Sequence, residues 1–436
     1  MFGYYAQLGL RSLRRNPVLT ALMVMAIGFG VAASMITYAV FRAISGDPMP
    51  WKSAQLFVPQ VDNWGPQSHG PDNEPPDMLG YLDATALMNA HAAQRQAATY
   101  PISFPVQPAD AAITPFSVNG YATYADFFGM FEVPFLYGGS WSAADDQRHA
   151  DTVVISSRLN QELFGGADSV GRDILLDDRS YRIVGVTQRW DPHPRFYDVA
   201  NDNAFAPAVD FYLPFTRAID LKTETNGHSN CNGHAGVGWD GMLRGQCTWI
   251  SLWVELPDAA AVQHYRSFLQ GYAAEQRRAG RFTWAPNVRL RNLMQWLDHE
   301  QVVPQESKVA LLLALGFLAV CLINTIGLLL AKFMRRANEI GVRRALGATR
   351  HEIYLQFLIE AGAVGFAGGV LGLLLTGIGV FGVGLVFEPD IARLARLDVS
   401  LVGLTLLVAV GATLVAAFYP TWRAARVQPA WQLKAS

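Results

Sequence analysis

The sequence has 436 residues, of which 51% are hydrophobic and only 16% are charged, and its formal net charge at pH 7 is −2. Soluble domains average about 25% charged residues, so this composition favours a membrane protein. It argues against nucleic acid as a partner, because a nucleic-acid-binding protein needs a basic excess to neutralise phosphates.

Four uncharged apolar runs occur along the chain, at residues 18–41, 309–331, 361–387 and 399–422. A bilayer core requires roughly 20 apolar helical residues, and each run is longer than that. The first run follows a basic segment, as in a secretory signal, but it exceeds the about 7–15 apolar residues of a signal. We therefore expect four transmembrane helices, the first of them retained.

Lysine and arginine are concentrated before the first run, after the second and after the fourth. Basic residues favour the cytoplasmic side, which places both termini inside. The predicted fold is an integral membrane α-helical protein with four transmembrane helices, N-in and C-in, and a large external α+β domain between helices 1 and 2. Its expected parts are a cytoplasmic amphipathic segment (1–17), the helices (18–43, 308–334, 355–387 and 399–422), the external domain (44–307), a cytoplasmic coupling segment (335–354), a short external loop (388–398) and a cytoplasmic tail (423–436).

The external segment mixes strand and helix patterns without membrane character. Residues 78–95 are rich in Ala and Leu and favour a helix, whereas the β-branched run 152–155 predicts a strand followed directly by a helix. A polar turn at 177–180 predicts a hairpin. Residues 247–256 are typical of a strand and 260–280 of an amphipathic helix. Together these patterns predict an α+β domain.

Cys231 and Cys247 flank a glycine-rich loop in the external segment, where oxidation is allowed. A disulfide between them would close a loop of about 15 residues and stabilise the domain by roughly 3 kcal/mol. Two alternatives are zinc binding, with His228 and His234 as further ligands, and two free thiols. The spacing matches no tight zinc pattern, so the compartment favours the disulfide.

Known catalytic motifs are missing from the sequence. It contains no G-x-x-x-x-G-K-[ST] phosphate loop and no G-x-S-x-G nucleophile elbow. The His-Glu pairs at His299 and His351 lack the second histidine of a zinc protease motif. We therefore predict that this chain is not an enzyme and that it carries no metal or cofactor.

Small and polar residues inside the apolar runs point to helix packing. Gly365 with Gly369, and Gly368 with Gly372, are spaced so that two helix backbones can approach closely. The motif does not distinguish packing within the chain from contact with a second copy. Asn324 is the strongly polar residue deep in the second run, and we expect it to hydrogen-bond to another helix.

The segment 338–350, NEIGVRRALGATR, combines charges with small residues between two apolar runs. As a helix it would place Glu339 and Arg343 at i and i+4, the favourable order for an ion pair, and would end near Gly347. The alternative is a solvated basic loop next to the membrane that touches anionic lipid. Small residues favour docking in a protein groove, and the expected docking residues are Glu339, Ile340, Gly341, Arg343, Arg344, Ala345, Leu346, Gly347 and Ala348.

A family resemblance rests on four motifs that occur in order. The stretch RRANEIGVRRALGATRHEIYLQFLIEAGAVGFAGGVLGLLL closely resembles the signature of MacB/FtsX-type ABC transporter permeases. The opening LGLRSLRRNPVLTALMVMAIGFGVAA and the tail YPTWRAARVQPAWQLK are similar to that family's ends. Residues 120–186 resemble a MacB-like periplasmic domain, whereas residues 188–249 are longer and richer in aromatic residues than the family pattern.

The resemblance implies a mechanotransmission (type VII) permease of the bacterial inner membrane, with its large domain in the periplasm. Two copies of a separate ATPase subunit would bind ATP and Mg and dock on the coupling segment. The permease would pair with a second copy or a paralogue in the lipid bilayer. Together with a periplasmic adaptor and an outer-membrane channel, it would export a peptide, an antibiotic or a similar compound. Alternative roles are an FtsX-like regulatory subunit without transport and a lipoprotein extraction subunit.

Overall fold

The computed structural model describes the chain except for residues 1–15, 69–71, 109–113, 202–203, 234–235, 387–398 and 426–436. The chain forms two compact units, one of residues 1–45 with 303–436 and the other of residues 46–302. The expected loop at 388–398 lies outside the described residues, as does most of the expected segments 1–17 and 423–436.

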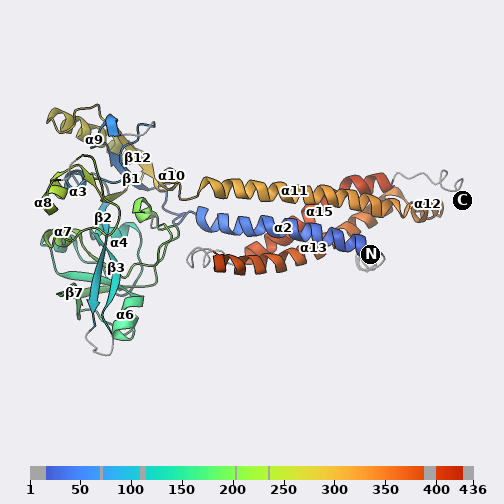
Figure 1. Cartoon of the computed structure of the whole chain (residues 1–436), viewed down its shortest axis with the longest axis horizontal. Helices are drawn as coiled ribbons and strands as arrows, with labels where there is room; N and C mark the ends of the chain where they lie inside the picture. The colour runs from blue at the N-terminus through green and yellow to red at the C-terminus, as the bar shows by residue number, and fades with distance from the viewer. Residues whose placement is uncertain are drawn as a thin grey trace. The chain divides into compact units, whose positions relative to one another are not determined.

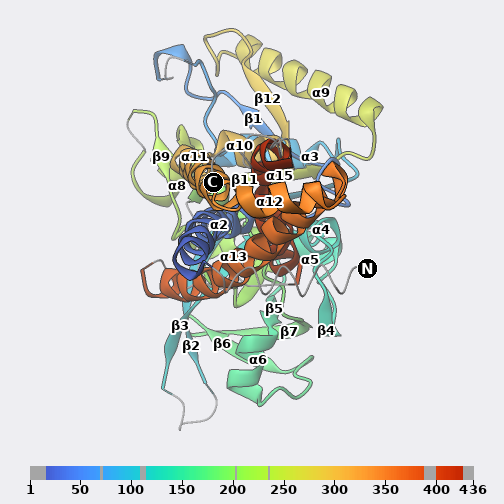
Figure 2. The same cartoon turned by 90° about the vertical axis from the view of Figure 1, so that its right-hand side faces the viewer.

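The first unit is a helical bundle (Figure 1). Its long helices, seen nearly along their axes in Figure 2, are α2 (Pro17–Ser45), α11 (Gln305–Met334), α13 (Arg350–Val386) and α15 (Val399–Ala425). Each is long and apolar enough to cross a membrane. This confirms the prediction of four apolar helices. A short helix, α12 (Ala337–Ala345), links α11 to α13.

The glycines of α13 pack inside the chain, against two different helices. A Cβ placed on Gly365 would lie 2.8 Å from the Cβ of Thr413, and one on Gly369 would lie 3.0 Å from the Cβ of Ala409, both on α15. Real Cβ atoms avoid separations this short, so a side chain at either glycine would push α13 and α15 apart.

The second glycine pair faces α2 in the same way. A Cβ on Gly368 would lie 2.7 Å from Cγ2 of Ile27, and one on Gly372 would lie 3.2 Å from Cγ1 of Val31. Of the two alternatives for these motifs, the structure therefore shows packing within the chain, with α13 held between α2 and α15.

Asn324 forms no hydrogen bond to another described helix of this chain. Its side chain lies on the exposed face of α11, and it makes no side-chain hydrogen bond to another residue that the structure describes. Cys321 and Thr325 occupy the buried positions on this part of α11. The Thr325 hydroxyl donates a hydrogen bond to the Cys321 carbonyl at 2.8 Å. Because the inward face is set by these neighbours, the expected hydrogen bond from Asn324 to a helix of this chain is not formed.

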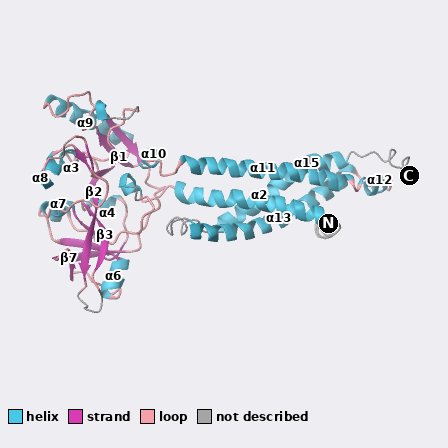
Figure 3. Ribbon diagram, in the orientation of Figure 1, coloured by secondary structure: helices cyan, strands magenta, loops and turns pink. Residues whose placement is uncertain are grey.

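The second unit is built on a mixed sheet, drawn in magenta in Figure 3. Among the described residues it has ten strands in the order β12-β1-β11-β2-β3-β8-β5-β7-β4, with β6 pairing to β2 and β7. The β3–β8 and β5–β7 pairs are parallel and the others antiparallel. The strands are β1 (Leu56–Val61), β2 (Arg95–Gln107), β3 (Phe116–Thr123), β4 (Phe135–Gly138), β5 (Thr152–Ser156), β6 (Asp173–Leu176), β7 (Arg179–Thr187), β8 (Phe211–Pro214), β11 (Ser251–Glu255) and β12 (Val288–Asn292).

Helices surround this sheet, and a separate ribbon pairs β9 (Asn230–Cys231) with β10 (Cys247–Thr248). The α-helices are α3 (Tyr81–Asn89), α4 (Asp126–Met130), α5 (Ala143–Gln147), α6 (Ser157–Phe164), α7 (Phe215–Asp220), α8 (Gly238–Arg244), α9 (Ala259–Arg278) and α10 (Leu293–His299), and the 3-10 helices are η1 (Pro66–Ser68) and η2 (Phe196–Asn201).

Both faces of the sheet are buried, each under its own apolar core. Alternate side chains of a strand point to opposite faces, so one strand contributes to both cores. On β11, Leu252 and Val254 join one apolar core, whereas Trp253 joins the other. The second core is aromatic: the ring centroids of Phe131 and Trp253 are 5.7 Å apart in an edge-to-face arrangement. Aromatic packing of this kind stabilises the core on that face of the sheet.

The expected helix at 78–95 is too long. The structure ends α3 at Asn89 and begins β2 at Arg95, which pairs with Glu255 of β11 in the sheet register. The Arg95 guanidinium also lies 2.9 Å from the Glu255 carboxylate. Pairing with a distant strand therefore overrides the local helix preference of this segment.

The glycine packing predicts a difference between two matched substitutions. Gly365→Ala should lower the thermal unfolding midpoint of the detergent-solubilised protein, because overpacking costs about 1–3 kcal/mol. Gly403→Ala is the control, since nothing lies within 4 Å of a Cβ at Gly403 and alanine favours a helix. Equal midpoints for the two variants would contradict the close approach of α13 to α15.

Candidate functional site

The expected docking segment contains the helix α12, and identifiable residues end this helix and start the next one. The helix runs from Ala337 to Ala345, and Leu346 caps its C-terminus. Gly347 follows with a φ of +103°, a conformation that a residue with a side chain rarely adopts. The next helix, α13, begins at Arg350, and the amide of the preceding Thr349 donates to the Glu352 carboxylate at 2.9 Å. The sequence therefore sets a short, separate helix here.

One face of α12 is fixed to the bundle by apolar packing. Ile340 is buried together with Ile353 and Phe357 of α13. Phe357 in turn packs on Phe333 at the end of α11, with ring centroids 4.3 Å apart. Because these contacts join three helices, α12 is attached to both of its neighbours in the sequence.

A buried ion pair adds a directional link between the same helices. Arg336, the residue that precedes α12, donates from Nη1 to both carboxylate oxygens of Glu360 on α13, at 2.9 and 3.1 Å. The Arg336 and Glu360 side chains are only 11% and 3% exposed. Lys332, four residues before Arg336, is buried as well. A buried charge that loses its partner is strongly destabilising, so this pair holds the start of α12 on α13.

The opposite face of α12 is open. Val342 is 58% exposed and Leu346 is 83% exposed, and Ala345 and Gly347 are exposed beside them. Arg343 borders this face and is held in position by Glu339 at 2.7 Å and by Gln356 at 3.0 Å. An apolar patch with a fixed basic border has the features of a helix that docks into a groove.

The predicted docking residues therefore divide into two groups. Ile340 and Gly341 are buried and attach the helix to the bundle, and Arg344 and Ala348 are half-buried. The exposed members are Arg343, Ala345, Leu346 and Gly347, with Glu339 half-buried and paired to Arg343. The sequence did not mark Arg336 and Glu360 as site residues. A charge at the edge of an apolar run costs little free energy when it faces water, so we did not expect either side chain to be buried. Their separation of 24 residues gave no local signal.

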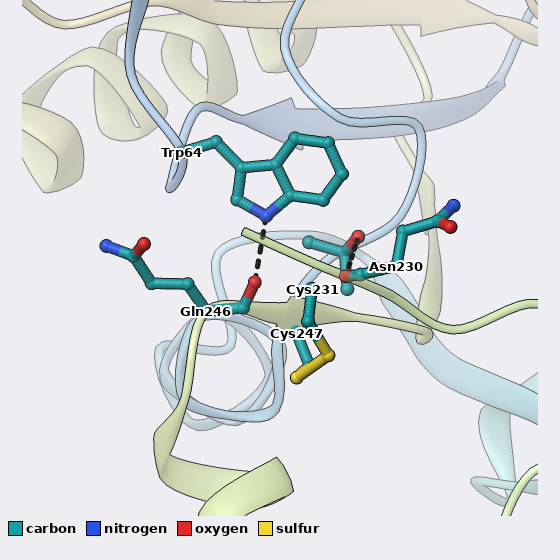
Figure 4. Close-up of a disulfide and its surroundings, with 6 residues drawn as sticks. Trp64, Asn230, Cys231, Gln246 and Cys247 are labelled. Carbon is teal, nitrogen blue, oxygen red and sulfur yellow. Dashed lines mark hydrogen bonds between the residues drawn. A yellow bond between two sulfur atoms is a disulfide. The ribbon is translucent and has the colours of Figure 1, made fainter. Parts of the chain in front are cut away.

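In the second unit, Cys231 and Cys247 form a disulfide (Figure 4). The two residues are directly paired between the antiparallel strands β9 and β10. The Trp64 indole donates to the Gln246 carbonyl at 2.9 Å, and the Thr248 hydroxyl donates to the Asn230 carbonyl at 3.3 Å. The first bond attaches the loop to the segment after β1, and the second joins the two ends of the loop to each other.

The zinc alternative does not fit this arrangement. Zinc binds cysteine as a thiolate, and both sulfurs are used by the disulfide. His228 is exposed, and His234 lies outside the described residues. The disulfide instead closes the glycine-rich loop that carries α8.

Comparison with known proteins identifies both parts of the chain. Residues 20–267, more than half of the chain, match the MacB-like periplasmic core domain, and residues 311–429 match the FtsX-like permease C-terminal domain. The macrolide export ATP-binding/permease protein MacB of Agrobacterium fabrum is 26% identical over 80% of this chain. A Wolinella succinogenes protein of the same name is 25% identical over 86% of it.

These relatives are longer proteins. The chain spans 47% of the Agrobacterium protein and 52% of the Wolinella protein, about half of their length. Among solved structures, the periplasmic region of MacB from Actinobacillus actinomycetemcomitans aligns with 56% of this chain and 92% of its own, at 12% identity and a TM-score of 0.35.

The buried ion pair predicts a large effect of an isosteric change. Glu360→Gln should lower the stability of the detergent-solubilised protein by about 3–5 kcal/mol, because it removes the negative charge that accepts both bonds from the buried Arg336. The matched control is Glu339→Gln, which breaks the more exposed pair with Arg343 and should cost less than about 1 kcal/mol. Thermal unfolding midpoints measure both. A Glu360→Gln protein as stable as the Glu339→Gln protein would show that the pair does not hold α12.

Proposed function

The chain belongs to the family of FtsX-like permeases with a MacB-like periplasmic core domain, and we propose that it is the membrane subunit of an ATP-driven exporter. In this proposal both termini and α12 are cytoplasmic, the unit of residues 46–302 is periplasmic, and the protein resides in the bacterial inner membrane. The distribution of lysine and arginine supports this orientation.

One observation carries the proposal: α12 is fixed on one face and open on the other. Arg336, Glu360 and Ile340 hold it to the bundle. Val342 and Leu346 expose an apolar surface that Arg343 borders. The sequence contains no phosphate loop, so we place ATP and Mg on a partner ATPase. Its groove would take the apolar surface, and its acidic residues would pair with Arg343 and Arg344.

Force applied to α12 would pass into α13 through the buried contacts. A movement of a docked ATPase would shift Arg336, and the bidentate bond to Glu360 would transmit that shift to a helix packed closely against both α2 and α15. The apolar runs carry no charge, as is expected of helices that transmit movement and do not carry ions at mid-membrane.

The proposed assembly contains two ATPase copies and a second permease chain, either a copy or a paralogue. Its cargo would be a peptide, an antibiotic or a similar compound, passed to a periplasmic adaptor and an outer-membrane channel. Support for this cargo class comes from relatives named as macrolide export proteins, to which the chain is similar at 24–26% identity.

Two variants test the docking helix. Charge reversal by Arg343→Glu with Arg344→Glu should reduce permease-stimulated ATP hydrolysis at least tenfold and abolish co-purification of the ATPase. Leu346→Asp should act in the same direction while leaving the ion pairs intact, because Leu346 is 83% exposed. ATP hydrolysis in proteoliposomes and affinity purification from native membranes measure both effects.

The matched control is Arg266→Glu, a charge reversal at an exposed position of α9 in the other unit. It should leave hydrolysis and co-purification unchanged. If the α12 variants also leave both unchanged, the segment is a solvated or lipid-facing loop and the proposal fails.

A further inference from the structure

Three side chains of types that can ligate a metal, from two distant parts of the sequence, converge in the second unit. They are Asp77, which follows β1, His299 at the end of α10, and Glu300, which caps that helix. One ligand atom of each lies within 4.8 Å of the others, and His299 Nε2 is 2.9 Å from Asp77 Oδ1. The cluster thus combines one imidazole nitrogen with two carboxylates.

Buried neighbours hold these ligands in place from two sides. The amide of Gln60, a fully buried residue of β1, donates to the Pro76 carbonyl and to Asp77 Oδ1, each at 3.3 Å. The Gln60 oxygen accepts from Arg291 of β12. On the other side, the Trp296 ring packs 5.6 Å from the His299 ring. Partners of this kind orient metal ligands and tune their affinity.

The two arginines near the cluster pair with a carboxylate outside it. Arg289 and Arg291 both pair with Glu74, at 3.3 and 2.6 Å. Burial raises the pKa of Glu74, but these arginines outweigh it and leave the pKa below its usual range. The two arginines pair with Glu74, whereas the hydrogen-bond partners of Asp77 among the described residues are the Gln60 amide and the His299 imidazole. The carboxylates of Asp77 and Glu300 would both face a cation bound in the cluster.

A cavity adjoins the cluster and gives access to it. It has a volume of about 450 Å³, and its lining includes Trp64 and Glu74 as well as Asp77, His299 and Glu300. An ion bound by three protein groups needs further ligands, and water in the cavity would supply them.

We propose that Asp77, His299 and Glu300 form a binding site for one divalent first-row transition-metal ion, for which Zn²⁺ is the probe. Imidazole suits zinc and its neighbours, whereas Mg²⁺ and Ca²⁺ prefer sites built from oxygen alone. Ligand atoms of a tetrahedral zinc ion are roughly 3.3 Å apart, so the cluster needs only small side-chain rotations to bind one.

This site revises the expectation that the chain binds no metal. The sequence shows His299 and Glu300 as a His-Glu pair without the second histidine of a zinc motif. The third ligand comes from a segment 222 residues away, so spacing alone could not reveal it. A bound ion would link the segment before α3 to the end of α10 and stabilise that edge of the unit.

The test uses the full chain in detergent, purified without a polyhistidine tag and stripped of metal with a chelator. Equilibrium dialysis with Zn²⁺, followed by elemental analysis, should give one zinc ion per chain at saturation. Zinc should raise the thermal unfolding midpoint, and a hundredfold excess of Mg²⁺ should not displace it. Cobalt(II) at the same site should show visible absorption that zinc removes.

Two site variants and one control complete the test. His299→Ala and the isosteric Glu300→Gln should each weaken zinc binding at least tenfold and abolish the zinc-dependent rise of the midpoint. His264→Ala, at an exposed position of α9, should bind zinc as the unchanged chain does. Equal affinities for the unchanged chain and both site variants, or an equal loss in His264→Ala, would overturn the proposal.

Discussion

The bond between Arg336 and Glu360 determines how α12 relates to the rest of the helical unit. Both side chains are buried, as is Lys332, and the arginine contacts both carboxylate oxygens, at 2.9 and 3.1 Å. Desolvating two charges is costly, and such a pair is rarely the most stable choice for a core. The pair is directional, and together with the bond from Arg343 to Gln356 it restricts the orientation of α12 on α13 more than apolar packing through Ile340 would.

Close packing in the helical unit would allow this link to transmit a movement of α12 to the long helices. Gly365 and Gly368 bring α13 against α15 and α2, so a displacement of α13 cannot be absorbed by loose side chains. Exposed Val342 and Leu346 lie on the side of α12 away from that packing. In the proposed mechanism a partner therefore moves the bundle by moving one short helix.

Much of this arrangement is predictable from the sequence, because local chemistry determines it. Four apolar runs predicted four helices, and the polar turn at 177–180 predicted the β6–β7 hairpin. Contacts between distant residues could not be predicted. Two examples are the ion pair between Arg336 and Glu360 and the start of β2 at Arg95, which results from its pairing with β11. The exposure of Asn324 could not be predicted either, because the inward face of α11 depends on how the whole bundle packs.

The central claim is that the open face of α12 contacts an ATPase, and photo-crosslinking tests it most directly. Position 346 would carry p-benzoylphenylalanine in place of Leu346, in native membranes, and adducts would be identified by peptide mass spectrometry. The account predicts a covalent adduct to a polypeptide that contains a phosphate-loop ATPase sequence. Adducts to phospholipid alone, with no protein adduct from this position or from position 342, would contradict it.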